Sequence, residues 1–470
     1  MHMPHRRILS VALLAVFTTV SFSAQAPGPA APAPRAALDA VAIEQKVDEL
    51  LSAHVKVNDF SGTVLLAEKG RPLVAKGYGY ANVEWQIPNT VDTKFRIGSL
   101  TKQFTSMLIM QLRERGTVRL EDSVCVYVAP CPDTWTPVTI HHLLTHTSGI
   151  PPYTGLAEWR KVNMMPKTID EMIGFFRDLP LEWIPGDNYA YNNSGYFLLG
   201  VVIEKATGKK YEEALQEMIL TPLGMKDTGY DWPGTILPRR ASGYQGRGAA
   251  RVNAPALDMQ QPYAAGSLYS TVADLLIWDQ ALYTEKLVPE TAKTIMWTPF
   301  KDGYAYGWGI RAASPASFGH SQMAHTGGIN GFSSMIIRVP DTNVTAIVLG
   351  NNAAAPASPI ARDLLAIYYG QPYTVPTART VATFDPAMFD QYTGKYEFSP
   401  QFAMTVTRDG NRFLTQATAQ QPIEIFPMSD VTFFPKVIDA ELTFVKGAEG
   451  KVTHLTLTQN GRTQTGRKIQ

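Results

Sequence analysis

The stretch "RIGSLTKQFTSML", residues 96–108, places a small hydroxyl and a lysine where a helix is expected to begin. Ser99 and Lys102 are three positions apart, so a helix turns both side chains to the same face. Either Ser99 caps the helix and Lys102 points at water, or the two residues are a nucleophile and its base. Apolar residues follow at helical spacing, before a stop signal at Gly116: Leu100, Phe104, Met107, Leu108 and Leu112.

A serine hydroxyl becomes a useful nucleophile only when a base takes its proton. Lysine can be that base if burial or a neighbouring cation keeps its amine neutral for part of the time. The N-terminus of the helix would also present the backbone N–H of Ser99 to a developing oxyanion. The pair alone is a weak signal, because a chain of 470 residues contains about one Ser-x-x-Lys by chance.

Two later stretches complete an ordered set of motifs. "YAYNNSGYFLLG", residues 189–200, contains Tyr191-Asn192-Asn193, and "MAHTGGINGF", residues 323–332, contains His325-Thr326-Gly327-Gly328. The order Ser-x-x-Lys, Tyr-x-Asn and Lys/His-Thr-Gly resembles the serine β-lactamase and penicillin-binding-protein family. The tyrosine-containing second motif is similar to that of class C β-lactamases, DD-peptidases and their esterase relatives.

The resemblance covers about residues 45–370 and includes the supporting stretches "TIHHLLTHTSGI" and "GSLYSTVADL". It implies an α/β chain with the β-lactamase/DD-peptidase-like fold, in which helices flank an antiparallel sheet beside a further helical region. Strand signals agree with this fold. They predict a hairpin about Glu68-Lys69-Gly70 and two strands about Pro340-Asp341.

The resemblance implies catalytic roles for three residues. Ser99 is the nucleophile that becomes acylated, and Lys102 is its base. Tyr191 can shuttle the Ser99 proton if nearby cations or hydrogen bonds lower the pKa of its phenol. Asn193 can donate an amide hydrogen bond to a substrate carbonyl while it accepts one from Lys102.

The third motif is expected to line the other side of the cleft and to bind substrate. Gly327 and Gly328 are expected to bind substrate there. The N–H of Gly328 would be the second oxyanion donor beside that of Ser99, and glycine suits a place where backbone and substrate come close. β-Lactamases of this group carry lysine where this chain has His325, whereas histidine occurs there in the peptidase and esterase branches. The change weakens the expectation of β-lactam hydrolysis without excluding it, because a neutral imidazole attracts a substrate carboxylate less than an ammonium does.

The character of the sequence changes at residues 371–384, which have Pro and Thr without a helical period and are predicted to be a linker. Beyond them, Asp409-Gly410 and Asn460-Gly461 mark hairpin turns between short strand-like runs. These runs predict a small β-barrel or sandwich, which resembles the lipocalin-like module often appended to this family. We therefore expect a catalytic domain over 40–370 and a small β-domain over 385–470.

The N-terminus has the pattern of a secretory signal peptide. His5-Arg6-Arg7 gives a positive start, an apolar run follows over residues 8–22, and Ala24-Gln25-Ala26 fits a small-x-small cleavage site. We expect a signal peptide over residues 1–26, a Pro/Ala-rich disordered segment over 27–39, and a periplasmic or secreted location. The alternative is a signal anchor that stays uncleaved.

The overall charge argues against two classes of partner. The formal net charge is +1, so no basic field exists to hold nucleic acid or an anionic membrane. We expect a small-molecule or peptide substrate, no nucleic acid, and no stable membrane insertion after removal of the signal. The oligomeric state is not predicted.

The only cysteines, Cys125 and Cys131, lie in a short proline-containing loop and are expected to form a disulfide in an exported chain. Free buried thiols are the alternative. We expect no metal or cofactor. His142 and His146 lack the glutamate of the zinc-peptidase helix motif and are expected to be packed histidines. Tyr80-Ala81-Asn82 also matches Tyr-x-Asn, but it precedes the serine motif and is expected to be structural.

Together these features predict a secreted or periplasmic serine hydrolase. It would acylate Ser99 with an ester, a D-amino-acid peptide or a β-lactam and then hydrolyse the adduct. The alternative is a penicillin-recognising binding or sensor protein that acylates without efficient turnover. A non-catalytic scaffold is disfavoured by the intact motifs, and an α/β-hydrolase is excluded because the chain has no Gly-x-Ser-x-Gly elbow.

Overall fold

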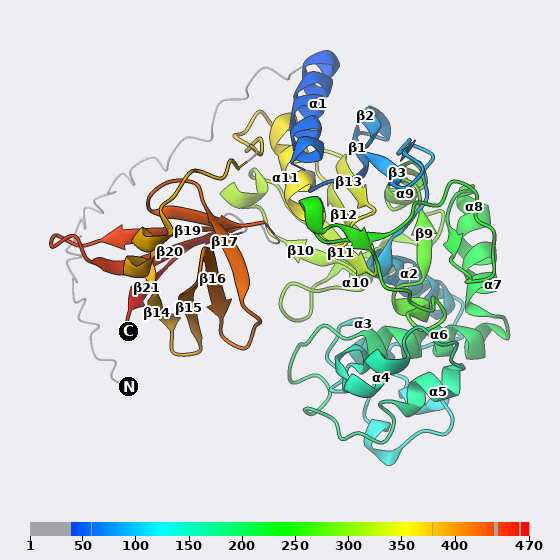
Figure 1. Cartoon of the computed structure of the whole chain (residues 1–470). Coiled ribbons are helices and arrows are strands. Elements are labelled where there is room, and N and C mark those ends of the chain that lie inside the picture. The colour runs from blue at the N-terminus through cyan, green and yellow to red at the C-terminus, as the bar shows by residue number, and fades with distance from the viewer. Residues whose placement is uncertain (1–38, 58, 378, 437–439, 460–461, 470) are drawn as a thin grey trace, which may run out of the picture. The chain divides into compact units, whose positions relative to one another are not determined.

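The computed structural model describes residues 39–57, 59–377, 379–436, 440–459 and 462–469. The signal peptide predicted over residues 1–26, all but the last residue of the segment 27–39, and the predicted Asn460-Gly461 turn lie outside these residues. Figure 1 shows the chain coloured from its N-terminus to its C-terminus.

A six-stranded sheet organises the part of the chain before residue 371, in the order β10-β11-β12-β13-β1-β2 (Figure 1). All neighbouring strands in it are antiparallel. β1 and β2 form the hairpin predicted about residues 68–70, and β12 and β13 are the strands predicted about Pro340-Asp341. The strand bounds are Gly62–Glu68 (β1), Arg71–Tyr78 (β2), Gly309–Arg311 (β10), Gln322–Ile329 (β11), Phe332–Val339 (β12) and Val344–Gly350 (β13).

Helices cover the sheet and form a separate helical region (Figure 1). Within the described ranges, no helix has both the length and the apolar composition needed to cross a membrane. The helix bounds are Ala40–Lys56 (α1), Thr101–Glu114 (α2), Ile140–Leu144 (α3), Ala157–Val162 (α4), Ile169–Gly174 (α5), Asn193–Thr207 (α6), Tyr211–Leu215 (α7), Thr221–Leu223 (α8), Val272–Ala281 (α9), Glu290–Trp297 (α10) and Ala357–Tyr368 (α11). Short strands complete this part: Tyr80–Asn82 (β3), Ile87–Pro88 (β4), Phe95–Arg96 (β5), Gly229–Tyr230 (β6), Tyr244–Gln245 (β7), Val252–Asn253 (β8) and Leu268–Ser270 (β9).

Both faces of the six-stranded sheet are buried. Alternate residues of a strand point to opposite sides, so a single strand contributes side chains to two cores. In β13, Ile347 and Leu349 belong to one hydrophobic core, and Ala346 and Val348 belong to a second. The second core includes the apolar faces of α1 and α11, whereas the first includes α2, α6 and α9. The predicted α/β architecture, with helices flanking an antiparallel sheet, is therefore confirmed.

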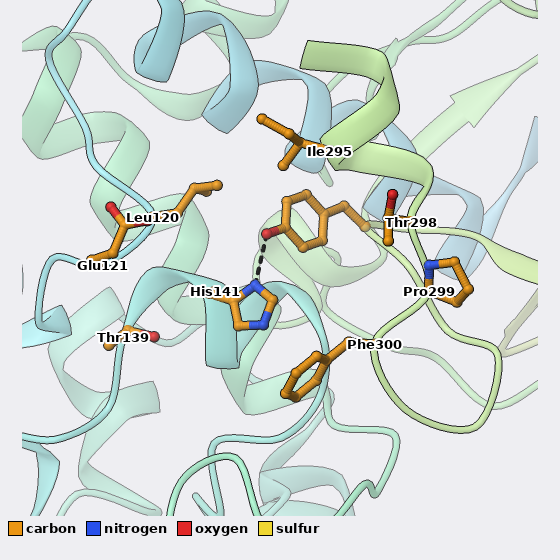
Figure 2. A pocket seen from close by; sticks show the side chains of 9 residues that line it. Leu120, Glu121, Thr139, His141, Ile295, Thr298, Pro299 and Phe300 are labelled. Carbon is orange, nitrogen blue, oxygen red and sulfur yellow. Dashed lines mark hydrogen bonds between the residues drawn. The ribbon is translucent and has the colours of Figure 1, made fainter. Parts of the chain in front are cut away.

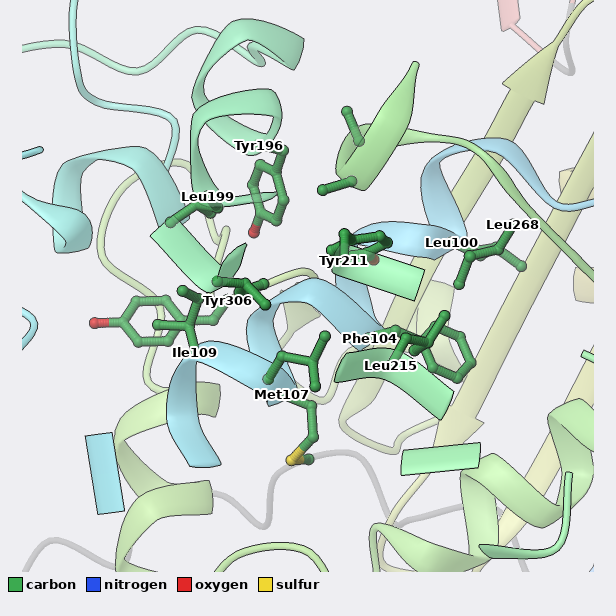
Figure 3. Packing of buried hydrophobic residues seen from close by; sticks show 14 of the residues in the cluster. Leu100, Phe104, Met107, Ile109, Tyr196, Leu199, Tyr211, Leu215, Leu268 and Tyr306 are labelled. Atoms are coloured by element: carbon green, nitrogen blue, oxygen red, sulfur yellow. The ribbon is translucent and has the colours of Figure 1, made fainter. Parts of the chain in front are cut away.

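Helix α2 forms where the spacing after Ser99 predicted it, but it is buried on every side. All twelve residues from Thr101 to Leu112 are buried, so the apolar face expected from the sequence is only part of its packed surface. The buried polar residue Gln103 is bonded through one atom, since its Oε1 accepts from Trp278 Nε1 at 2.9 Å while its Nε2 has no hydrogen-bond partner among the described atoms. Figure 3 shows α2 packing with α6 and α7 through the first core: Leu100, Phe104, Met107, Ile109, Tyr196, Leu199, Tyr211 and Leu215.

The residues after the predicted linker form a closed barrel of eight strands, β14 to β21 in sequence order. The expectation of a barrel or sandwich is thus resolved as a barrel, and the hairpin predicted at Asp409-Gly410 joins β15 to β16. The strand bounds are Gly394–Ser399 (β14), Phe402–Asp409 (β15), Arg412–Ala417 (β16), Ile423–Pro427 (β17), Thr432–Pro435 (β18), Ala440–Lys446 (β19), Val452–Gln459 (β20) and Arg462–Lys468 (β21).

Aromatic side chains fill the interior of this barrel. A 3₁₀ segment before the first strand, Pro386–Tyr392, contributes two of them. Phe389 stacks on Phe413 with ring centroids 4.2 Å apart, and Tyr392 stacks on Phe444 at 4.4 Å. The barrel therefore has a hydrophobic core of its own.

Candidate active site

Ser99 lies in the 3₁₀ turn Gly98–Leu100 that leads into α2. Glycine is required at 98, because its φ of +52° lies in the left-handed region and an added Cβ would come within 3.0 Å of the β11 backbone. Thr101 Oγ1 donates to the Gly98 carbonyl at 2.7 Å, and Ser334 Oγ donates to the Ile97 carbonyl at 2.9 Å. These contacts fix the backbone on both sides of Ser99.

Lys102 lies in the first turn of α2, and its Nζ contacts three acceptors from different segments of the chain. It lies 3.0 Å from Ser99 Oγ, 2.8 Å from Asn193 Oδ1 and 2.8 Å from the Ala265 carbonyl oxygen. An ammonium group would donate to all three. A neutral amine would instead donate its two N–H groups to Asn193 and Ala265 and accept the Ser99 proton with its lone pair. The same geometry therefore suits both protonation states of the lysine.

Burial favours the neutral amine. Lys102 is 0% exposed, and desolvation holds its pKa well below the ordinary value for lysine. None of the hydrogen-bond partners described for Nζ is a carboxylate. Two further neighbours are aromatic, since Nζ lies 4.8 Å from the ring centroid of Tyr191 and 5.4 Å from that of Tyr196. These surroundings meet the condition under which a lysine can act as a base.

The Tyr-x-Asn motif lies at the N-terminus of α6. Its middle residue, Asn192, caps the helix by accepting a hydrogen bond from Ser194 N at 2.7 Å. Asn193 is the first helical residue, with its Oδ1 on Lys102 and its Nδ2 3.5 Å from Thr154 Oγ1. Tyr191 precedes the cap and is 39% exposed. Its ring therefore borders both solvent and Lys102.

The phenol of Tyr191 has a raised pKa, not the lowered pKa that its motif led us to expect. Burial of the hydroxyl raises the pKa, although part of the ring meets solvent. A hydrogen bond with Ser99 lowers it by less, and the nearby phenols of Tyr196, Tyr189 and Tyr153 add smaller increases. Tyr191 is therefore a neutral phenol, and hence a proton donor, in the free protein.

His325 faces into the protein from β11. Its Nδ1 lies 2.6 Å from the Thr326 carbonyl and its Nε2 lies 2.9 Å from the Tyr304 hydroxyl. A carbonyl only accepts, so Nδ1 carries the proton and Tyr304 donates to Nε2 of the neutral ring. Burial, followed by repulsion from Lys102, lowers the pKa of His325 to about 4. The ring contacts Tyr191 with centroids 6.0 Å apart, and it offers no free nitrogen to a substrate carboxylate.

Gly327 and Gly328 bring the β11 backbone close to the serine turn. A Cβ on Gly327 would lie 2.0 Å from the Ile97 carbonyl oxygen, whereas a Cβ on Gly328 would meet no atom within 4 Å. Ile329 and Phe332 close the two-residue turn as a hydrogen-bonded pair, and in an antiparallel ladder hydrogen-bonded and non-hydrogen-bonded pairs alternate. The next pair, Gly328 with Ser333, is therefore not hydrogen-bonded, and the N–H of Gly328 points away from β12.

Two further side chains belong to this cluster, although no motif assigned them to it. The His146 ring is buried, with its centroid 4.4 Å from that of Tyr191 and 4.5 Å from that of Tyr304. His146 is thus a packed histidine, as predicted, but it packs against predicted catalytic residues. The likeness of its stretch "TIHHLLTHTSGI" to the family is the signal that could have placed His146 in the site. Tyr304 lies in a loop without a recognisable motif.

The competing sequence features have structural partners. Asn82 Nδ2 donates to Ser242 Oγ at 3.0 Å, and Tyr80 is 44% exposed on β3. His142 Nδ1 accepts from Thr139 N at 3.2 Å. Over the described ranges, no three His, Cys, Asp or Glu side chains are grouped as ligands of a metal ion.

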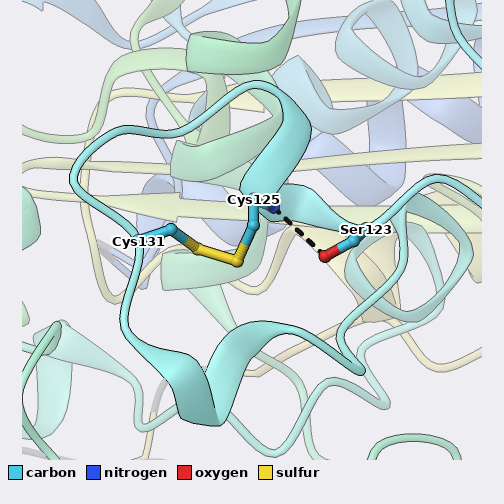
Figure 4. The surroundings of a disulfide bond; sticks show 3 residues. All are labelled: Ser123, Cys125 and Cys131. Carbon is cyan, nitrogen blue, oxygen red and sulfur yellow. Dashed lines mark hydrogen bonds between the residues drawn. A yellow bond between two sulfur atoms is a disulfide. The ribbon is translucent and has the colours of Figure 1, made fainter.

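A disulfide joins Cys125 to Cys131 in the segment between α2 and α3 (Figure 4). Their Cα atoms are 5.3 Å apart. Ser123 Oγ accepts from the backbone N–H of Cys125 at 3.3 Å and starts the short 3₁₀ turn that carries this cysteine. The bond thus closes a small loop on the helical region.

A pocket of about 540 Å³ is lined by none of the predicted site residues (Figure 2). Its walls are mostly apolar, and a hydrogen bond of 2.7 Å joins His141 Nδ1 to Tyr306 Oη within it. This pocket is therefore distinct from the candidate active site around Ser99. The pocket lining is Leu120, Glu121, Thr139, His141, Ile295, Thr298, Pro299, Phe300 and Tyr306.

Comparison with known proteins identifies the family. The family model described as Beta-lactamase matches residues 47–370, which is more than half of the chain. The chain belongs to the β-lactamase family. Penicillin-binding protein 4* of Bacillus subtilis (strain 168) is 30% identical over 431 residues, covering 83% of this chain and 91% of that protein. This chain is accordingly a β-lactamase-related serine hydrolase.

Solved structures share the fold. The octameric penicillin-binding protein homologue from Pyrococcus abyssi matches with a TM-score of 0.62 at 27% identity, over 92% of this chain and 100% of that one. D-amino acid amidase from Ochrobactrum anthropi SV3 shares the fold alone, with a TM-score of 0.61 at 23% identity over 69% of this chain and 98% of that one. The β-lactamase/DD-peptidase-like fold is thus confirmed. Residues 378–468, which include the barrel, match a domain of unknown function, DUF3471.

Proposed function

We propose that this protein is an exported serine hydrolase that forms an acyl-enzyme on Ser99. The observation that carries the proposal is the position of Lys102 Nζ, which is fully buried and lies 3.0 Å from Ser99 Oγ. Its two other acceptors are an amide side chain and a backbone carbonyl, so no carboxylate holds it in the charged form. The competing interpretation required a lysine that points at water, which a fully buried side chain does not do.

Acylation begins when Ser99 Oγ attacks the carbonyl carbon of the substrate and its proton passes to the lone pair of Lys102 Nζ. The backbone N–H groups of Ser99 and Gly328 stabilise the oxyanion. The bond to the leaving group then breaks as the phenol of Tyr191 gives it a proton, and Lys102 returns its extra proton to Tyr191. The products are an ester on Ser99 and a neutral alcohol or amine.

Hydrolysis of the adduct reverses these roles. Water attacks the acyl carbon, its proton passes to the same pair of groups, and Ser99 Oγ leaves as a restored hydroxyl. Asn193 Nδ2 donates to the carbonyl oxygen of the substrate side chain or backbone, while its Oδ1 orients Lys102. Gly327 allows the close approach of β11, and His325 lines the wall against Tyr191.

We infer that the substrate is an ester, or a D-amino-acid peptide without a free C-terminal carboxylate beside the scissile bond, before a β-lactam. The three classes share an electrophilic carbonyl, but β-lactams, like peptides that end in a free D-amino acid, also carry a carboxylate. His325 is neutral and both of its nitrogens are occupied, so this position supplies no cation to bind that carboxylate. The N-terminal pattern supports a periplasmic or secreted location, and the proposed catalytic domain spans 40–370, with a linker over 371–384 and the barrel domain over 385–470.

The test is turnover of the mature protein on a p-nitrophenyl ester, a D-alanyl peptide and nitrocefin, with Ser99→Ala as the matched control. We expect multiple turnovers on the ester or the peptide, abolished in Ser99→Ala while the melting temperature stays nearly unchanged. A single burst without turnover on every substrate would favour the penicillin-recognising sensor. Activity that survives in Ser99→Ala would contradict the proposal.

A further inference from the structure

Both backbone N–H groups that flank Tyr191 donate to one residue, His146. Ala190 N lies 3.1 Å from the His146 carbonyl oxygen, and Asn192 N lies 3.1 Å from His146 Nδ1. One acceptor comes from the main chain and the other from the side chain. The backbone of Tyr191 is therefore held on both sides by His146.

The ring of His146 also constrains the ring of Tyr191. The two centroids are 4.4 Å apart with planes at 47°, and Tyr304 and Tyr196 contact the His146 ring at 4.5 and 5.0 Å. His146 is 1% exposed. Because buried side chains are packed at crystal-like density, a ring at this distance limits the directions that the Tyr191 phenol can take.

Simple core packing does not account for a histidine at this position. Its φ is +60°, a left-handed conformation that is unfavourable for most residues with a Cβ. Since Nδ1 accepts an N–H, Nε2 carries the ring proton, and Nε2 is buried without a hydrogen-bond partner among the described atoms. An apolar side chain would fill the space without that orphaned donor. What histidine adds is the Nδ1 acceptor.

We propose that His146 is a positioning residue that sets the phenol of Tyr191 against Ser99 and Lys102. The inference rests on the proposed function, in which Tyr191 passes a proton to the leaving group. His146 itself exchanges no proton in this scheme. Burial, with repulsion from Lys102 and His325, keeps its pKa well below the ordinary value for histidine, so the ring stays neutral.

A double-mutant cycle between His146 and Tyr191 tests the proposal, with kcat/KM for an activated ester as the readout. We expect His146→Ala to lower kcat/KM about 100-fold, because a misplacement of about 1 Å costs about that much. In a Tyr191→Phe background the same substitution is expected to change kcat/KM less than about threefold. Equal losses in the two backgrounds would overturn the proposal.

Matched variants separate positioning from stability. His146→Asn keeps an acceptor near the place of Nδ1 and tolerates a positive φ, so we expect kcat/KM within about tenfold of wild type. His146→Gly also tolerates this φ but has no acceptor, and it replaces the alanine variant if that protein does not fold. His54→Ala removes another buried histidine, hydrogen-bonded to Asp59 at 2.9 Å, and is expected to lower Tm without loss of kcat/KM. Equal losses in the asparagine and glycine variants would contradict the role of Nδ1.

Failure of the proposed function gives a different result. If wild-type Ser99 is not acylated, or if Tyr191→Phe keeps full activity, the proposed mechanism is contradicted and this inference with it. If acylation occurs, Tyr191→Phe is impaired and the cycle is additive, only the role of His146 is contradicted.

Discussion

Four titratable side chains lie together around Ser99, and burial drives each toward its neutral form. The pKa values of Lys102, His146 and His325 fall, whereas that of Tyr191 rises. Once Lys102 has taken the Ser99 proton, a positive charge on either histidine would lose its hydration and would be repelled by the lysine ammonium. We therefore expect these four side chains to carry at most one extra proton at a time, the one that leaves Ser99.

His325 gives this arrangement a signature in stability. Its pKa is about 4 in the folded protein against an ordinary 6.5, so between these pH values the unfolded chain binds a proton that the folded protein does not. The contribution of His325 to the free energy of unfolding is therefore expected to fall as the pH falls through this window, by about 2 kcal/mol between pH 7 and pH 4.5. His325→Gln is expected to remove about that much of the pH dependence. Denaturant unfolding of both proteins at the two pH values measures it, and an unchanged dependence in the variant would show that His325 is not buried as a neutral ring.

Residue identities predicted which groups carry the chemistry, but not their electrostatics. Motif order was sufficient to nominate Ser99, Lys102 and Asn193, which the structure joins through Lys102 Nζ. The direction of the Tyr191 pKa was wrong, because burial decides it and motif spacing carries no information about burial. The contacts of His146 were missed for a related reason, since they join segments more than 40 residues apart.

At the scale of elements, a buried ion pair ties α9 to the six-stranded sheet. Arg338 Nε of β12 donates to Asp279 Oδ1 of α9 at 2.8 Å, and Thr345 Oγ1 of β13 donates to Asp279 Oδ2 at 2.7 Å. The Arg338 guanidinium also lies 4.5 Å from the ring centroid of Tyr283 and 5.4 Å from that of Trp297. Both charged side chains are at most 1% exposed. Such a pair is costly to break because one charge is left buried alone.

Asp279→Ala is expected to lower the free energy of unfolding by about 3–5 kcal/mol, since it leaves Arg338 without its counter-ion. The control is Asp92→Ala, which removes an exposed partner 3.7 Å from Arg239 and is expected to cost less than about 1 kcal/mol. Chemical denaturation of the two variants gives the comparison. Similar small losses in both would mean that the α9 contact is not buried as described.

Sequence periodicity predicted the elements that carry the site better than it predicted their environment. Helix α2 and the strands about Pro340-Asp341 form where their patterns indicate. Complete burial of α2 was not predictable from its own pattern, because polar residues such as Gln103 are covered by residues distant in the sequence, such as Trp278. Local patterns describe a helix, whereas its surroundings depend on segments that the pattern does not contain.

At the scale of the whole molecule, three hydrophobic cores divide the described chain. Two lie on opposite faces of the six-stranded sheet, and their fully buried members end at Ile367. The third fills the barrel and begins at Phe389 among its buried members. The residues of the candidate site all lie before residue 371, in the part of the chain that contains the first two cores. This is expected if that part and the barrel are separate domains, each with its own core.

A chain that ends at residue 377 is therefore expected to fold and to keep its acylation activity. Thermal melting tests the fold, and labelling by a fluorophosphonate probe tests the site, with full-length Ser99→Ala as the blank. We expect cooperative melting and labelling similar to that of the full chain. Cooperative melting without labelling would mean that the barrel domain contributes to the active site.

The most direct test of the central claim, that Ser99 is acylated with Lys102 as its base, is rapid-quench peptide mass spectrometry during ester turnover. We predict an acyl adduct on the peptide that contains Ser99 and none on that peptide in Ser99→Ala. Lys102→Met is expected to slow adduct formation about 1000-fold, within the range that a general base contributes. An adduct on another residue, or adduct formation at the wild-type rate in Lys102→Met, would contradict the account.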